Sequence, residues 1–208
     1  MQKLIELGVG NAHLLTVGTA MDGPVAGFGR RFWSWLNGKA PLDISAMQSI
    51  GVRSLAYSGR YLLVPYTMRL LAKVVKSAPG AAEARMEITL AVADKSRDAP
   101  RFQHDTFPSD TTRREVMRQM LTGAQVNLLS KSQMDHGRSL TITLNDGRQL
   151  TLHLDQGFGG WRVDGTHRHD FGAAEAAQVP CRDTSTLSNP RRFPVDDNSS
   201  ISFCGAGS

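Results

Sequence analysis

Cysteine is scarce in this sequence, where Cys181 and Cys204 are the only two among 208 residues. Neither has a second Cys or a His at the spacing of zinc ligands, and two thiols do not make a disulfide framework. The pair therefore excludes a disulfide-stapled scaffold and a cysteine-based zinc site, and gives no support for redox chemistry.

Long hydrophobic runs are missing as well. No apolar run approaches the roughly 18 residues that a membrane helix needs. The first fifteen residues, MQKLIELGVGNAHLL, lack a charged region followed by the small-residue cleavage site of a secretory signal. We therefore expect no membrane span and a cytoplasmic location.

Nucleotide-binding motifs are also absent. The glycine-rich stretches 27–31 and 157–160 lack both the Gly-Lys-Ser/Thr ending and the strand–glycine–helix context of such loops. The segment His167-Arg168-His169-Asp170 resembles a metal site, but alternate residues of an extended chain point to opposite sides. We expect a solvated loop there, and neither a metal nor any other cofactor.

Basic residues are in excess, with 24 Lys+Arg against 19 Asp+Glu, a net charge of +5 and a pI near 9.6. Arginine recurs beside glycine or aromatic residues, and its guanidinium group matches phosphate oxygens bidentately. This pattern favours a phosphate-bearing polymer as partner, although many such arginines in proteins are simply solvated. The arginines concerned are Arg30, Arg31, Arg53, Arg60, Arg138, Arg148 and Arg162.

Hydrophobic periodicity predicts an α/β domain over residues 51–163. Alternating residues indicate strands, residues repeating every three or four positions indicate helices, and Asp146-Gly147 between two alternating arms indicates a β-hairpin. The predicted fold is a mixed sheet flanked by helices, with the hairpin at its C-terminal end. In order, the elements are strand 52–57, helix 65–77, strand 86–92, helix 111–123, strand 125–129 and hairpin 140–154.

The flanking regions are less regular. Residues 1–50 form an aromatic-rich extension in which Phe28, Phe32 and Trp35 share one helical stripe, so a short helix should pack on the core. Trp33 and Trp35 are candidate partner-binding residues, with core packing as the alternative. Residues 164–208 are expected to be a partly ordered extension with a mobile tail.

Three segments can converge at the ends of neighbouring strands, where ligands of α/β proteins usually bind. They are Ser58-Gly59-Arg60-Tyr61, then Asp135-His136-Gly137-Arg138, and finally the stretch 155–161. Arginines, a histidine and glycine-exposed N–H groups together make an anion site. The candidate residues for phosphate or nucleic-acid binding are Arg60, Tyr61, Arg138, Gln156 and Trp161, with His136 as hydrogen-bond donor.

This order of motifs resembles the phospholipase D-like domain at the C-terminus of MIT-domain proteins and its bacterial cousins linked to defence-island helicases. The matching motifs are Ser58-Gly59-Arg60-Tyr61-Leu62, His136-Gly137-Arg138, the Asp146-Gly147 hairpin and Asp155-Gln156-Gly157-Phe158. Glycine replaces the family's acid in the first two motifs. The resemblance implies roles for His136, Arg60 and Arg138, but supports no role that depends on the acids.

Three functions follow from these observations. The first is a non-catalytic module that binds a nucleic-acid backbone, or docks on a helicase-type partner, in a bacterial antiphage or DNA-processing complex. The second is a phosphodiesterase or nuclease with His136 as catalytic nucleophile, although the next acid, Asp146, lies a full strand away. The third is a purely structural subunit of a larger assembly. The sequence leaves open whether the chain forms a homodimer.

Overall fold

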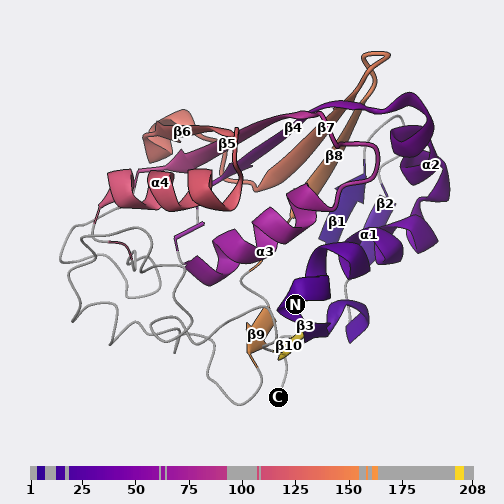
Figure 1. Cartoon of the computed structure of the whole chain (residues 1–208), viewed down its shortest axis with the longest axis horizontal. Helices are drawn as coiled ribbons and strands as arrows, with labels where there is room; N and C mark the ends of the chain where they lie inside the picture. Colours follow the sequence, from indigo (N-terminus) through magenta and orange to yellow (C-terminus); the bar gives the residue numbers. More distant parts are fainter. Residues whose placement is uncertain are drawn as a thin grey trace.

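The computed structural model describes residues 4–7, 13–16, 19–60, 62–63, 65–92, 107, 109–154, 158, 161–163 and 200–203. Within them, a seven-stranded mixed sheet has the order β2–β1–β8–β7–β4–β5–β6 (Figure 1). Its strands are β1 (Leu4–Leu7), β2 (His13–Thr16), β4 (Val52–Gly59), β5 (Arg85–Ala91), β6 (Gln125–Leu129), β7 (Ser139–Leu144) and β8 (Gln149–Leu154). The predicted α/β class, with a mixed sheet, flanking helices and a hairpin, is confirmed.

Both kinds of pairing meet at strand β4, which is parallel to β5 and antiparallel to β7. The parallel connections run through α3 (Pro65–Lys76) and α4 (Asp110–Met120). As a result β4, β5 and β6 end at one edge of the sheet, where β7 begins; we call this the carboxyl edge. The turn between β7 and β8 lies at the opposite edge, which we call the hairpin edge.

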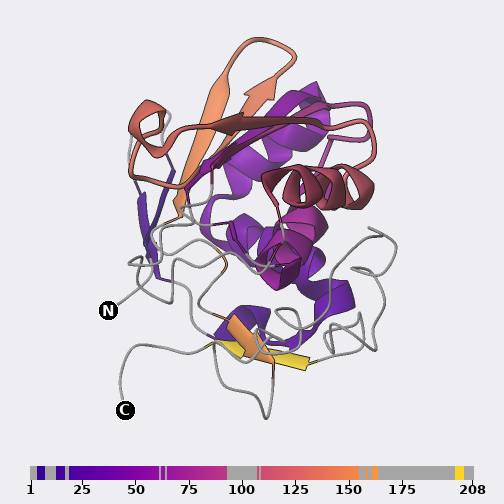
Figure 2. The same cartoon turned by 90° about the vertical axis from the view of Figure 1, so that its left-hand side faces the viewer.

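The helices cover one face of the sheet (Figures 1 and 2). Besides α3 and α4 they include α1 (Phe28–Lys39) and α2 (Pro41–Ile50). Strands β7 and β8 bury every second residue against this layer, and the residues between are half-buried or exposed, as expected for a sheet with one packed face. No helix in the described ranges has the length and hydrophobicity to cross a membrane.

Helices α1 and α3 pack closely at Gly29. A Cβ atom at this position would lie 2.0 Å from the carbonyl oxygen of Lys73. One turn later, the buried indole Nε1 of Trp33 donates a 2.8 Å hydrogen bond to the Val74 carbonyl. These contacts attach residues of the 1–50 region to the α/β core. The domain boundaries themselves remain a prediction.

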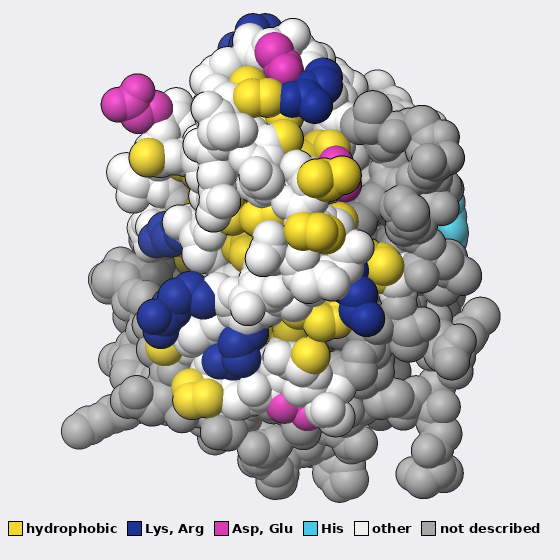
Figure 3. All heavy atoms as spheres, turned by 90° about the vertical axis from the view of Figure 1, so that its right-hand side faces the viewer, with side chains coloured by type: hydrophobic (Ala, Val, Ile, Leu, Met, Phe, Trp, Pro, Cys, Tyr) yellow, Lys and Arg dark blue, Asp and Glu magenta, His cyan; other side chains and the backbone are white. Residues whose placement is uncertain are grey.

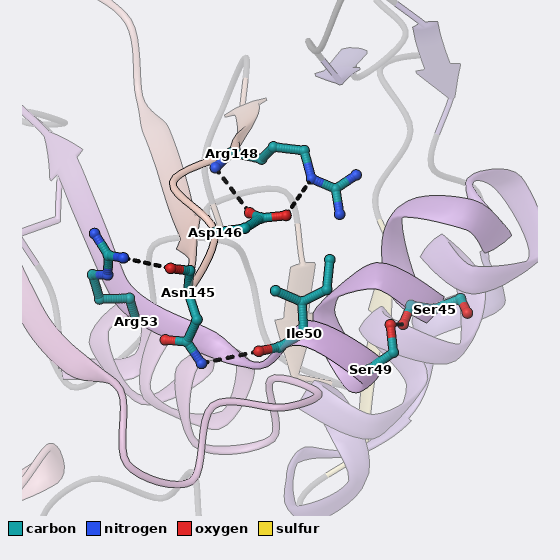
Figure 4. A network of polar contacts seen from close by, with 7 residues as sticks. All are labelled: Ser45, Ser49, Ile50, Arg53, Asn145, Asp146 and Arg148. Atoms are coloured by element: carbon teal, nitrogen blue, oxygen red, sulfur yellow. Dashed lines mark hydrogen bonds and ion pairs between the residues drawn. The ribbon is translucent and has the colours of Figure 1, made fainter.

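The hairpin edge is held by a network around Asn145 (Figure 4). Its side-chain amide donates to the Ile50 carbonyl at 2.9 Å, and Arg53 donates to the Asn145 carbonyl. In the turn, the backbone N–H of Arg148 donates to the Asp146 carboxylate, and the Arg148 side chain pairs with the same group at 2.8 Å. That backbone hydrogen bond is the main cause that lowers the pKa of Asp146.

A second, three-stranded sheet joins distant parts of the chain. Strand β10 (Ser200–Phe203) pairs antiparallel with both β3 (Gly23–Pro24) and β9 (Trp161–Val163). Residues 200–203 thus form a strand within the region predicted to be a partly ordered extension with a mobile tail. Most of the predicted extension, residues 164–199, lies outside the described residues. Short 3-10 helices occupy Thr19–Met21, Val25–Gly27 and Lys131–Gln133.

Candidate functional site

The candidate site lies at the carboxyl edge, between β4 and β7. Ser58 of β4 pairs with Ser139 of β7. Arg60 follows the first strand directly, and the segment from His136 to Arg138 leads into the second. The sheet register thus brings two of the three segments proposed from the sequence to one place.

Arg60 contacts the turn that carries His136. Its guanidinium Nη1 lies 3.3 Å from His136 Nδ1, and Nη2 donates to the carbonyl of Met134. The Nε atom of Arg60 is shielded from solvent and has no hydrogen-bond acceptor among the described residues. Arg60 therefore ties the turn to the end of β4 while part of its donor capacity stays unused.

The contact also determines the tautomer of His136. A guanidinium group can only donate hydrogen bonds, so Nδ1 of the exposed imidazole must accept. In the neutral ring the proton is then on Nε2, which becomes a donor. This arrangement can donate to an anion.

Arg138 lies on the β7 side of the site. Its backbone carbonyl accepts a 2.7 Å hydrogen bond from Leu154 at the end of β8, and its charge acts on the phenol of Tyr57. The ring of Tyr57 runs along β4 toward the carboxyl edge, because a Cβ atom on Gly59 would lie 2.4 Å from the Tyr57 hydroxyl. Glycine at 59 therefore leaves room for the buried tyrosine beneath the site.

Because of Tyr57, the domain should become less stable at alkaline pH. Burial raises the pKa of this phenol from 10.0 to about 12, and the charge of Arg138 opposes the rise. The folded state holds the proton of Tyr57 more tightly than the unfolded chain does. The resulting contribution to the free energy of unfolding is complete below pH about 10 and is lost as pH rises toward about 12. The total is about 2 to 3 kcal/mol. Urea unfolding across this range should show the decline, and Tyr57→Phe should show a smaller one.

Other predicted site residues lie elsewhere. Trp161, a candidate for nucleic-acid binding, is 4% exposed, with its ring 5.1 Å from that of Phe28, so its ring packs in the core. Trp33 is also 4% exposed, which corrects its proposed partner-binding role in favour of the core-packing alternative. Trp35 is half-buried against the core. Tyr61 and Gln156 lie outside the described residues.

The geometry gives little support to nucleophilic catalysis by His136. With Nδ1 accepting from Arg60, Nε2 carries the proton in the neutral ring, whereas a nucleophile needs a lone pair. Asp146, the next acid along the chain, lies in the turn at the hairpin edge. A six-residue strand, about 20 Å long, separates it from the histidine.

Sequence reasoning missed one buried cation near this edge. Arg113 of α4 is fully buried, forms a 2.8 Å ion pair with Asp110 and donates to the carbonyl of Ala91 at the end of β5. The spacing of Asp110 and Arg113 on one helical face was the available signal. Among the described residues, no cluster of three His, Cys, Asp or Glu side chains could hold a metal ion.

Comparison with protein families identifies the lineage of the chain. The family model described as the C-terminal domain of the DEAD/DEAH box helicase YjiV matches residues 11–185. The chain belongs to this family. The YjiV C-terminal family is helicase-associated, which bears out the expected link to helicases. The finer resemblance to phospholipase D-like domains is not supported by this match. Neither the curated proteins nor the solved structures yielded a match.

Proposed function

We propose that this domain is a non-catalytic accessory module of a helicase and binds a nucleic-acid backbone at the carboxyl edge. One observation carries the proposal: the contact between Arg60 and His136, which joins segments 76 residues apart, two residues before Arg138. Helicases act on nucleic acid, so phosphate is the anion that this site should meet. A bacterial antiphage or DNA-processing complex is the setting we infer from the resemblance and the helicase family.

Each group has a distinct task in this proposal. Arg138 supplies a guanidinium group for phosphate oxygens, and His136 donates from Nε2. Arg60 fixes the ring of His136 through Nδ1 and supplies its remaining N–H groups. The described part of the site offers no aromatic platform, since Trp161 is buried. We therefore expect binding that depends strongly on salt and little on base sequence.

Fluorescence anisotropy with labelled single- and double-stranded oligonucleotides, over a series of salt concentrations, tests the proposal. The variant His136→Gln/Arg138→Gln keeps Arg60 and its bond to Met134. Since a hydrogen bond to a charged group contributes about 1.5–3 kcal/mol, the affinity should fall tenfold or more. The slope of log K against log salt should also become shallower by about 0.9 for duplex DNA, because one phosphate contact of Arg138 is lost.

The matched control is Arg53→Gln/Arg148→Gln, which removes cations at the hairpin edge (Figure 4). Its affinity should stay close to that of the unaltered protein. Equal losses in both variants would mean that only net charge matters, and would contradict a site at the carboxyl edge. Wild-type protein without salt-dependent binding would contradict the function itself.

A further inference from the structure

Two helices carry six of the 24 Lys and Arg residues and none of the Asp and Glu residues. Helix α1 has the sequence FGRRFWSWLNGK and α3 the sequence PYTMRLLAKVVK, each with three Lys or Arg and no Asp or Glu. Together they carry six positive charges, one more than the net +5 of the whole chain. All other residues therefore sum to −1, so the excess charge that first indicated an anionic partner resides on these helices.

Arg31 is bound within the fold. It donates to the carbonyls of Met21 at 3.0 Å and Pro24 at 2.8 Å, and burial is the largest cause that lowers its pKa. We call the three exposed cations of the two helices the helix patch. Its members are Arg30, Lys39 and Lys76.

The patch forms one surface because the two helices cross with almost no space between them. Gly29 of α1 lies against the backbone of Lys73, and Arg30 follows Gly29 directly. Arg30, Lys39 and Lys76 are exposed, while Arg69 and Lys73 are half-buried. Figure 3 views the molecule from the side of the hairpin edge and shows Lys and Arg side chains spread over its lower half, with few carboxylates among them.

We propose that the helix patch is a second binding surface for the nucleic-acid backbone, separate from the carboxyl edge. A surface with more cations than carboxylates raises the local concentration of polyanions and fits a repeating phosphate chain. The choice of nucleic acid as the ligand rests on the proposed function, whereas the basic surface itself is independent of that function. An acidic protein is the competing occupant, but only a polymer can engage both surfaces along one molecule.

Helix α3 sets the distance between the two surfaces. Arg60 precedes its first turn, and Lys73 and Lys76 lie in its last turns. Its 12 residues span about 18 Å. Phosphates of one DNA strand are spaced about 3.4 Å apart along the duplex axis, so roughly five intervals separate the surfaces. Oligonucleotides well beyond this length should bind more tightly than short ones, because the second contact becomes intramolecular.

The test uses Arg30→Gln/Lys76→Gln, which removes one exposed cation from each helix. Glutamine has nearly the helix propensity of Lys and Arg, so the fold should be unaffected. For long duplexes we expect an affinity loss of tenfold or more and a salt slope shallower by about 1.8. In this variant, long duplexes should bind no more tightly than oligonucleotides of about five nucleotides, because the second contact is lost. The control Arg53→Gln/Arg148→Gln removes the same charge and should retain both properties.

The outcomes separate the two proposals. If Arg30→Gln/Lys76→Gln binds like its control while His136→Gln/Arg138→Gln is impaired, the helix patch is refuted and the carboxyl-edge site stands. The reverse result refutes the carboxyl-edge site and supports the patch. Polyglutamate serves as the competitor at equal charge concentration. If it displaces duplex DNA from the wild type as effectively as unlabelled DNA does, the patch recognises carboxylates generally and the proposal is overturned.

Discussion

Replacing Trp33 with alanine is expected to lower the free energy of unfolding by about 3–5 kcal/mol, the typical cost of deleting a buried large aromatic ring. The indole is 4% exposed, lies edge-on to Phe32 with ring centroids 5.1 Å apart, and bonds to the Val74 carbonyl. The change leaves a cavity. It also deprives the Val74 carbonyl, in the last turn of α3, of the indole N–H donor. Chemical denaturation measures the loss directly.

Two further variants separate the causes. Trp33→Phe keeps most of the ring but not the N–H group, so it should cost about 1–3 kcal/mol for the lost hydrogen bond and the smaller ring. Trp35→Ala, in the same helix but only half-buried, should cost clearly less than Trp33→Ala. Equal stability losses at 33 and 35 would contradict the assignment of Trp33 to the core.

Replacing Gly29 with alanine is expected to destabilise the domain by about 1–3 kcal/mol or more, because the added methyl group has no space. Its carbon would lie 2.0 Å from the Lys73 carbonyl oxygen and 2.5 Å from the carbonyl carbon. These are backbone atoms, so the whole helix α1 must move away from α3. The hydrogen bond from Trp33 to Val74 would lengthen, and tryptophan fluorescence should report the change alongside the unfolding curve.

Gly38 provides the control on the same helix. A Cβ atom at this position meets no other heavy atom within 4 Å. The same Gly→Ala substitution should therefore stabilise the domain by up to about 1 kcal/mol, through the higher helix propensity of alanine. Opposite signs at 29 and 38 would establish that the crossing of the helices, and not helix propensity, requires glycine at 29. Stabilisation at both positions would contradict the close packing.

The elements predicted from the sequence are those whose signal is local. The hairpin of β7 and β8 follows from strict alternation around Asp146-Gly147, and α4 from its periodicity. In the structure Ser109 caps α4 by accepting a hydrogen bond from the Thr112 N–H group. Strands β1 and β10 have four residues each, and both pair with distant segments, β1 with β8 and β10 with β3 and β9. Helix α2 was also missed, although Pro41 at its first position is a recognised start signal.

The candidate site shows the same division. Placing Arg60 and His136 at strand ends was possible from the sequence, because strand ends adjoin in an α/β layer. Their contact and the tautomer of His136 depend on the register between β4 and β7, which no local pattern specifies. Trp161 was misjudged because its burial depends on Phe28, far away in the sequence. The helix patch could not be predicted from the total charge, because it depends on which faces α1 and α3 expose after they pack.

The small sheet of β3, β10 and β9 also constrains the order of folding during synthesis. Its middle strand is made of residues 200–203, yet its partners are residues 23–24 and 161–163. Chains fold from the N-terminus as they emerge from the ribosome, so the α/β sheet can assemble while β3 still awaits its partner. The small sheet can therefore form only after residues 200–203 have been synthesised, and until then β3 remains an unpaired edge.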